Sequence, residues 1–261
     1  MKKISKVFPA ILSLSLISIG PSVISPQTSF AANPVSKSIS GATAEKMLKA
    51  AYAKNSEHNS KSPYTISLIT YYKDKTTKTD IYSADALGNM YNKAQYGAET
   101  ILIGQDYYST EHDELNPQEL AIATELGLNT EAKFAQIKIT EIEPIQTLKE
   151  WQETIRFSAI INFSSRFPLA GMMKLYPKSK LTLKTESNKK TITFSNPQLG
   201  SRDVWTITNG LVTSYIIYDA NNKMEYKAIF KTTSPLIAQP EGPFMEVGKL
   251  IADPRYKALQ G

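Results

Sequence analysis

The sequence contains no cysteine, and this absence excludes several kinds of site. Disulfide frameworks, thiolate metal sites and cysteine nucleophiles all depend on that side chain. A lipid anchor of the lipoprotein type needs a cysteine at its cleavage site, so it is excluded as well. The chain must therefore be stabilised by a hydrophobic core, and the roughly 230 residues after position 31 are enough for one sizeable domain.

Histidine is almost as scarce, and catalytic motifs are missing. The two histidines are His58 and His112, both in polar stretches. His112 lies in the acidic run Glu111–Glu114, but four consecutive residues seldom converge on one ion, and acids also favour the start of a following helix. No Gly-x-Ser-x-Gly, phosphate-binding glycine loop or zinc-protease helix motif occurs. We therefore expect no catalytic residue, no metal site and no cofactor, and we expect a protein that is not an enzyme.

Runs of basic residues are also lacking after the first six positions. The formal net charge is +6, and three of those charges belong to Lys2, Lys3 and Lys6, so the rest of the chain carries +3. Only Lys189 and Lys190 are adjacent beyond that point. This pattern predicts that nucleic acid is not a partner.

The first 31 residues have the composition of a signal peptide. A basic MKKISK is followed by the apolar VFPAILSLSLISI and then by small residues, with Ser29 and Ala31 at the positions expected before a cleavage. The apolar run is short for a membrane span. We expect export, with cleavage near Ala31, to an extracellular or periplasmic/cell-envelope space. Retention of the segment as an anchor is the alternative.

The remaining chain predicts a flexible segment over 32–42 and a single α+β domain over 43–261. A helix is expected from Thr43, a second from Asn116 to Gly127 with a capping pattern, a third over 145–157 and a short one from Thr130. Between and after them lie short β-branched and aromatic segments with polar links, which are typical of antiparallel meanders. The order helix, meander, helices, meander indicates an α+β fold with an antiparallel sheet.

One hairpin, Thr208–Lys231, departs from simple alternation. Its second strand alternates apolar and polar residues, whereas its first is apolar on both faces, with Leu211, Tyr215 and Ile217 on one face and Val212, Ile216 and Tyr218 on the other. A strand of this kind needs cover on both faces, which indicates an inner position. We therefore expect a strongly curved antiparallel β-sheet, an unclosed half-barrel covered by helices, with apolar surface left on its concave side.

The order of these elements resembles the bacterial lipoprotein-carrier superfamily, which includes LolA/LolB-like carriers and LppX/LprG-type lipid carriers. The similarity is carried by TAEKMLKAAYAKN as an opening helix, by the two meanders around a proline-started helix, and by RDVWTITNGLVTSYIIYDANNKMEYKAIFK as the C-terminal meander. The resemblance implies a half-barrel whose concave side binds acyl chains. The sequence carries no lipoprotein cysteine, and no ligand-binding residue is transferred from the family.

The leading interpretation is an exported protein that binds an apolar ligand, a lipid or a lipidated protein. Its expected lining comprises residues on strands of two-faced or strongly apolar character: Ile66, Leu68, Met90, Ile101, Ile103, Ile216 and Tyr218. The second interpretation is an exported interaction or structural protein with a filled core, which uses its 14 tyrosines to contact a cell-envelope partner. An enzyme of unrecognised type is the third. The sequence leaves the oligomeric state open.

Overall fold

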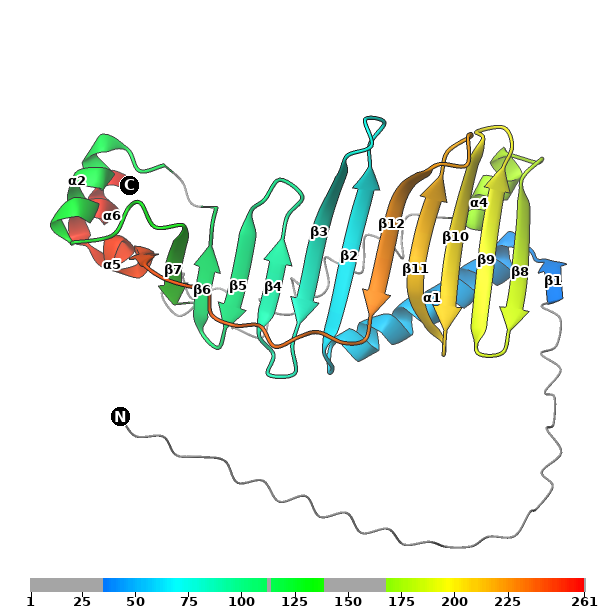
Figure 1. Ribbon diagram of the computed structural model, residues 1–261, viewed down its shortest axis with the longest axis horizontal. Coiled ribbons are helices and arrows are strands. Elements are labelled where there is room, and N and C mark those ends of the chain that lie inside the picture. The colour runs from blue at the N-terminus through cyan, green and yellow to red at the C-terminus, as the bar shows by residue number, and fades with distance from the viewer. Residues whose placement is uncertain (1–34, 112–113, 139–167, 261) are drawn as a thin grey trace, which may run out of the picture. The chain divides into compact units, whose positions relative to one another are not determined.

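The computed structural model describes residues 35–111, 114–138 and 168–260, and the strands of these residues form one sheet (Figure 1). The strands are β1 Val35–Ser38, β2 Tyr64–Tyr71, β3 Thr77–Ala84, β4 Met90–Lys93, β5 Glu99–Ile103, β6 Asp106–Ser109, β7 Phe134–Lys138, β8 Lys180–Glu186, β9 Lys189–Asn196, β10 Ser201–Thr208, β11 Leu211–Tyr218, β12 Met224–Lys231 and β13 Phe244–Glu246. The described helices are α1 Gly41–Asn59, α2 Pro117–Glu125, α4 Leu169–Leu175, α5 Val247–Ala252 and α6 Pro254–Gln260.

The 13 strands lie in the order β1-β8-β9-β10-β11-β12-β2-β3-β4-β5-β6-β7-β13. The two outermost strands, β1 and β13, do not pair with each other, so the sheet is open. The predicted α+β class is confirmed. The prediction of an antiparallel sheet holds for every described pair except β7–β13, which is parallel. The chain crosses from β12 to the far end of the sheet before β13, and it enters that strand in the direction of β7.

The sheet consists of two meanders joined by a pairing that is distant in sequence. Strands β8 to β12 follow one another as hairpins, as do β2 to β6, and β7 pairs with β6 after the connection that contains α2. They meet where β12 pairs with β2, with Tyr226 opposite Thr70 and Lys231 opposite Thr65. The first strand of the Thr208–Lys231 hairpin is β11, which lies between β10 and β12. Its predicted inner position is therefore confirmed.

The N-terminal helix begins earlier than its sequence pattern predicts. Ser40 caps α1, because its side chain accepts a hydrogen bond from the Thr43 backbone N–H at 3.2 Å. The expected flexible segment 32–42 is structured from Val35 onward, since β1 pairs with β8 and α1 starts at Gly41. A Cβ on Gly41 would lie 2.5 Å from Ala170 Cα, so only glycine allows this close approach of α1 to α4.

Of two further predicted helices, one is a strand in the structure and the other lies outside the described residues. The expected short helix from Thr130 is wrong, because Phe134–Lys138 is strand β7, which pairs with β6 and β13. Pairing with two neighbours there outweighs a weak local helical pattern. The helix predicted over 145–157 lies outside the described residues.

The helix predicted from Asn116 is confirmed together with its cap. The Asn116 side chain accepts hydrogen bonds from the backbone N–H groups of Gln118 and Glu119, and the Glu119 carboxylate accepts one from the Asn116 N–H in return. We expect Asn116→Ala to destabilise α2 by about 1 kcal/mol, because two N–H groups lose their acceptor. Hydrogen exchange across Pro117–Glu125 measures this loss. Exchange as slow as in the exposed control Gln118→Ala would contradict it.

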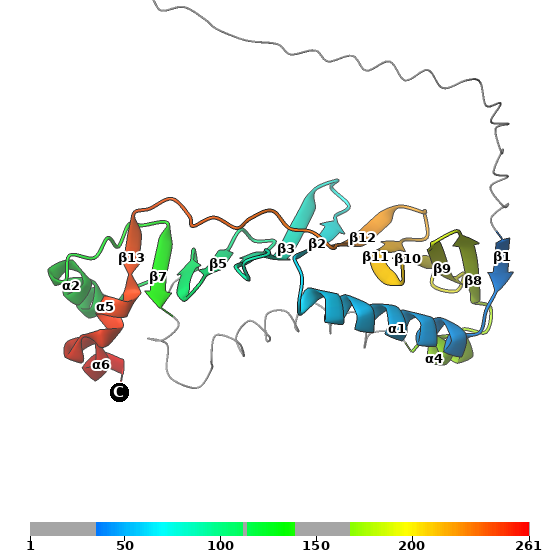
Figure 2. The same cartoon turned by 90° about the horizontal axis from the view of Figure 1, so that it is seen from below.

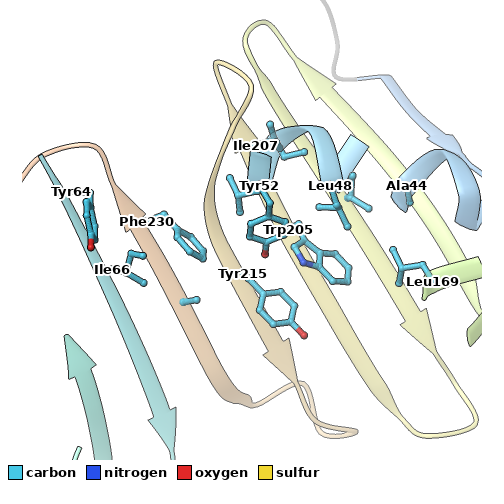
Figure 3. Close-up of a cluster of buried hydrophobic side chains, with 14 of the residues drawn as sticks. Ala44, Leu48, Tyr52, Tyr64, Ile66, Leu169, Trp205, Ile207, Tyr215 and Phe230 are labelled. Carbon is cyan, nitrogen blue, oxygen red and sulfur yellow. The ribbon is translucent and has the colours of Figure 1, made fainter. Parts of the chain in front are cut away.

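The main core lies between α1 and the β8–β12 half of the sheet, and it extends across β2 to buried residues of β3, β4 and β5 (Figures 2 and 3). Trp205 of β10, Tyr215 of β11 and Phe230 of β12 are buried beneath Leu48 and Tyr52 of α1. We call this side the helix-side face. Because residues directly opposite each other in antiparallel strands share a face, the register extends the helix-side face from β8 to β7.

The other side of the sheet, here called the opposite face, is crossed by the segment 232–243 (Figure 2). Ile237 of this segment packs against the cluster of Ile101, Tyr108 and Phe134. The Asp85 carboxylate fixes the segment, because it accepts a hydrogen bond from the Ile237 N–H at 2.9 Å. The same carboxylate accepts bonds from Leu87 N–H and from the backbone and side chain of Asn89, and hydrogen bonds of this kind hold its pKa below the usual range although burial raises it.

A β-bulge in β11 changes which residues share a face at the start of the strand. Thr206 lies opposite Ser214, but Ile207 lies opposite Val212, so Thr213 has no partner on β10. The extra residue moves Val212 onto the same face as Tyr215. The predicted division of faces is therefore wrong at Val212 and Leu211, which exchange sides. Ile216 and Tyr218 do lie on the face away from Tyr215.

Candidate ligand-binding face

A row of half-buried apolar and aromatic side chains follows the helix-side face beyond the core. Each of them packs against the core cluster but keeps part of its surface exposed: Leu68, Tyr82, Tyr107, Ile217 and Tyr226. They come from β2, β3, β6, β11 and β12 and thus span the junction of the two meanders. Register places Ile217 opposite Tyr226, and Tyr226 opposite Thr70. Partial burial of these large side chains leaves apolar surface exposed beside the core.

The structure does not bring the seven predicted lining residues together. Ile66 and Met90 lie on the helix-side face but inside the core, with 1% and 3% of their surface exposed. Leu68 lies on the same face and is half-buried, so it is the one predicted lining residue that belongs to the half-buried set.

The other four predicted residues lie on the opposite face. Ile101 is buried with Tyr108 and Phe134, and Ile103 packs against that cluster. Ile216 and Tyr218 also face away from α1, and the Arg202 guanidinium lies 4.2 Å from the Tyr218 ring centroid. The mixed list arose because a two-faced strand offers no signal of which side the helices cover.

Sequence reasoning missed a carboxylate on the helix-side face. Asp203 of β10 is in phase with Trp205 and Ile207, both of which are buried there. Its side chain accepts a hydrogen bond from the Tyr215 hydroxyl at 3.1 Å. The signal was present in RDVWTIT, where an acid takes the inward position of an alternating strand.

The surroundings of Asp203 are mainly aromatic and apolar. The rings of Trp205 and Tyr215 stack with centroids 5.0 Å apart, and the Tyr226 ring lies 6.1 Å from that of Tyr215. Burial raises the pKa of the Asp203 carboxyl to about 6, although the Tyr215 hydroxyl acts in the other direction. Burial, together with the charge of Asp203, raises the pKa of Tyr215 above its ordinary value.

Two other candidate sites are less well formed. Of the acidic run, His112 and Asp113 lie outside the described residues, and the Glu111 carboxylate accepts a hydrogen bond from Tyr96. No cluster of three or more metal-ligating side chains occurs in the described part of the chain. A hollow of about 310 Å³ lies at the β9–β10 turn and is lined by Lys180, Ser195, Asn196, Pro197, Gly200 and Ser201.

Comparison with known proteins gives no information about the function of this site. No family model matches the chain, and no curated protein matches it. Among solved structures it is similar to the polo-box domain of budding yeast Cdc5 in complex with Spc72 phosphopeptide, with 9% identity, 77% of each chain covered and a TM-score of 0.15. A similarity this low carries no argument about fold or function. None of the described helices is long and apolar enough to cross a membrane.

Proposed function

We propose that this protein binds an apolar ligand, a lipid or a lipidated protein, on the helix-side face of its sheet, without catalysing a reaction on it. The observation that carries the proposal is the half-buried row of Leu68, Tyr82, Tyr107, Ile217 and Tyr226 beside a sealed core. Each of these side chains has one part packed against the protein and another part exposed. Apolar pockets with few polar groups are the usual surroundings of small ligands.

The curvature of the sheet, its cover by helices and the export of the protein are part of the same proposal. The sheet is a strongly curved, unclosed half-barrel covered by helices, similar to the bacterial lipoprotein-carrier superfamily, and the protein acts after export to the cell envelope or beyond. The contacts of α1 and α4 with the core cluster support the helical cover, because both helices lie on the side that bears the row. The signal peptide predicted over 1–31 lies outside the described residues.

Two adjacent residues provide a matched test of this face. Ile217 and Ile216 are both half-buried, have the same side chain and point to opposite faces. We expect Ile217→Gln to weaken binding of the uncharged fluorescent probe N-phenyl-1-naphthylamine about tenfold, because apolar contact with the ligand is lost. Ile216→Gln is expected to leave the affinity within about twofold, since its side chain lies on the other face.

The measurement is a fluorescence titration of the full chain, with thermal unfolding recorded for both variants. Native mass spectrometry of the purified protein tests independently for a ligand bound during expression. Failure of the folded wild type to bind the probe or any ligand would reject the proposal and favour an interaction protein with a filled core. Equal effects of the two substitutions would place the binding surface elsewhere.

A further inference from the structure

The carboxylate of Asp203 is the polar group at one end of the apolar row. Register places Asp203 directly opposite Ile217, which lies opposite Tyr226 on the next strand. Within the described residues the carboxylate accepts one hydrogen bond, from Tyr215, through its Oδ1 atom. The second oxygen receives none from those residues, so it is available to a ligand at the edge of the row.

No positive side chain neutralises Asp203 in the described part of the chain. Its same-face neighbours across the strands are Phe194 of β9 and Ile217 of β11. Lys78 of β3 ends the same cross-strand row, but it is four strands away, roughly 19 Å at the usual strand spacing. A carboxylate that is partly removed from water without a positive partner is unfavourable for folding and is characteristic of functional sites.

The remaining titratable groups around the row do not replace a positive partner. The hydroxyls of Tyr52, Tyr215 and Tyr226 come from α1, β11 and β12, and burial raises the pKa of Tyr52 and Tyr215, so both stay neutral in the physiological range. Charged residues on nearby elements include Glu45 of α1 and Lys174 of α4. On the helix-side face of neighbouring strands they are Lys190 of β9, which lies opposite Ile207 and further along the strand than Phe194, and Lys78 and Asp80 of β3. Glu45 accepts a hydrogen bond from the Ala170 N–H, and Asp80 accepts one from the Gln95 N–H.

We propose that Asp203 binds the positively charged head group of an amphiphile whose hydrocarbon chain lies across Ile217, Tyr226 and Leu68. This inference rests on the proposed function and adds the charge of the ligand to it. The ionised carboxylate attracts a cationic head, and the tyrosine rings beside it are suitable neighbours for an ammonium group. An anionic head, such as that of a fatty acid, meets like charge at the same place and binds more weakly.

Three probes with the same dodecyl chain separate the charge from the apolar contact. They are dodecyltrimethylammonium, uncharged dodecyl maltoside and dodecanoate, each titrated below its micelle concentration as a competitor of N-phenyl-1-naphthylamine. We expect the cation to bind most tightly and dodecanoate most weakly. Asp203→Asn should weaken the cation about tenfold, the scale of a partly buried charge pair, and leave the maltoside unchanged.

Glu225→Gln is the matched control, because it removes one exposed carboxylate next to Tyr226 on β12 and should change no affinity. A pH series provides a second measurement that needs no variant. The trimethylammonium head keeps its charge at every pH, so its binding to the wild type should weaken as the pH falls through about 6, where the Asp203 carboxyl becomes protonated. Binding to Asp203→Asn should not follow that curve.

The possible results distinguish this inference from the proposed function. If all three probes bind and Asp203→Asn affects them equally, the proposed function stands and the role of Asp203 is rejected. If dodecanoate binds more tightly than the cation, the site prefers an anionic head group and the inference is rejected. If no probe competes, the apolar site itself is rejected, and the inference is rejected with it.

Discussion

Asn55→Ala is expected to lower the free energy of unfolding by about 2–4 kcal/mol. Asn55 lies in α1 with 4% of its surface exposed, and its side chain forms two hydrogen bonds with one residue of the sheet. Its Nδ2 donates to the Val212 carbonyl at 2.9 Å, and its Oδ1 accepts from the Val212 N–H at 2.8 Å. Alanine would leave both backbone groups of a fully buried residue without their partner, which costs more than the loss of the contact itself.

Asn55 can bind the Val212 backbone because β12 does not pair with β11 at that residue. The pairing of β11 with β12 begins at Ser214, and Thr213 is the bulged residue, so β12 does not reach Val212. An asparagine amide offers one donor and one acceptor, as a neighbouring strand would. Asn55 thus completes the sheet from a helix and fixes the position of α1 over the core.

Urea unfolding of Asn55→Ala, compared with Lys49→Ala, measures this contribution. Lys49 is exposed on the same helix, so its substitution controls for the helical propensity of alanine, and it should change stability by less than about 0.5 kcal/mol. Equal stabilities for the two variants would mean that water or a shifted backbone satisfies Val212. That result would remove the proposed reason for the fixed position of α1.

Local sequence patterns predicted those parts of the fold that depend on neighbouring residues. The cap at Asn116, the strand at Tyr64 and the Thr208–Lys231 hairpin each follow from a short stretch of sequence and are present in the structure. The pairing of β12 with β2 joins residues that are distant in the chain, and no local signal specifies it. The start of α1 at Gly41, rather than after Thr43, was missed for a similar reason, since the close contact of Gly41 with Ala170 is tertiary.

The candidate site was harder to predict because it depends on the phase of each strand. A single bulged residue, Thr213, reverses the face of Val212, and sequence alternation alone cannot locate such a residue. A search for apolar residues also selected the sealed core, in which Ile66 is found, rather than its half-buried border. Asp203 was overlooked since polar residues on strands are usually solvent-exposed, although its phase with Trp205 marks it as inward-facing.

Asp203→Asn is expected to make the protein more stable at neutral pH. The pKa of Asp203 rises to about 6 in the folded protein from an ordinary value of 3.8, mainly through burial. The folded state therefore holds a proton that the unfolded state has released over pH 4 to 6, and wild-type stability falls as the pH rises through this window. Above pH 6 this pKa difference corresponds to a loss of about 3 kcal/mol in the free energy of unfolding of the wild type. Because the carboxylate is partly in contact with water, we expect the variant to gain about 1–2 kcal/mol.

Urea unfolding of the wild type and Asp203→Asn at pH 4 and pH 7.5 tests the sign. The difference between the two proteins should be small at pH 4, where the wild-type carboxyl is protonated in the fold, and should favour the variant at pH 7.5. Other acids, such as Asp85 with its lowered pKa, change stability in the opposite direction but do so equally in both proteins. A variant less stable than the wild type at pH 7.5 would show that the carboxylate supports the fold. A variant that is more stable yet binds the cationic probe less tightly would show that Asp203 is retained for the ligand at the expense of stability.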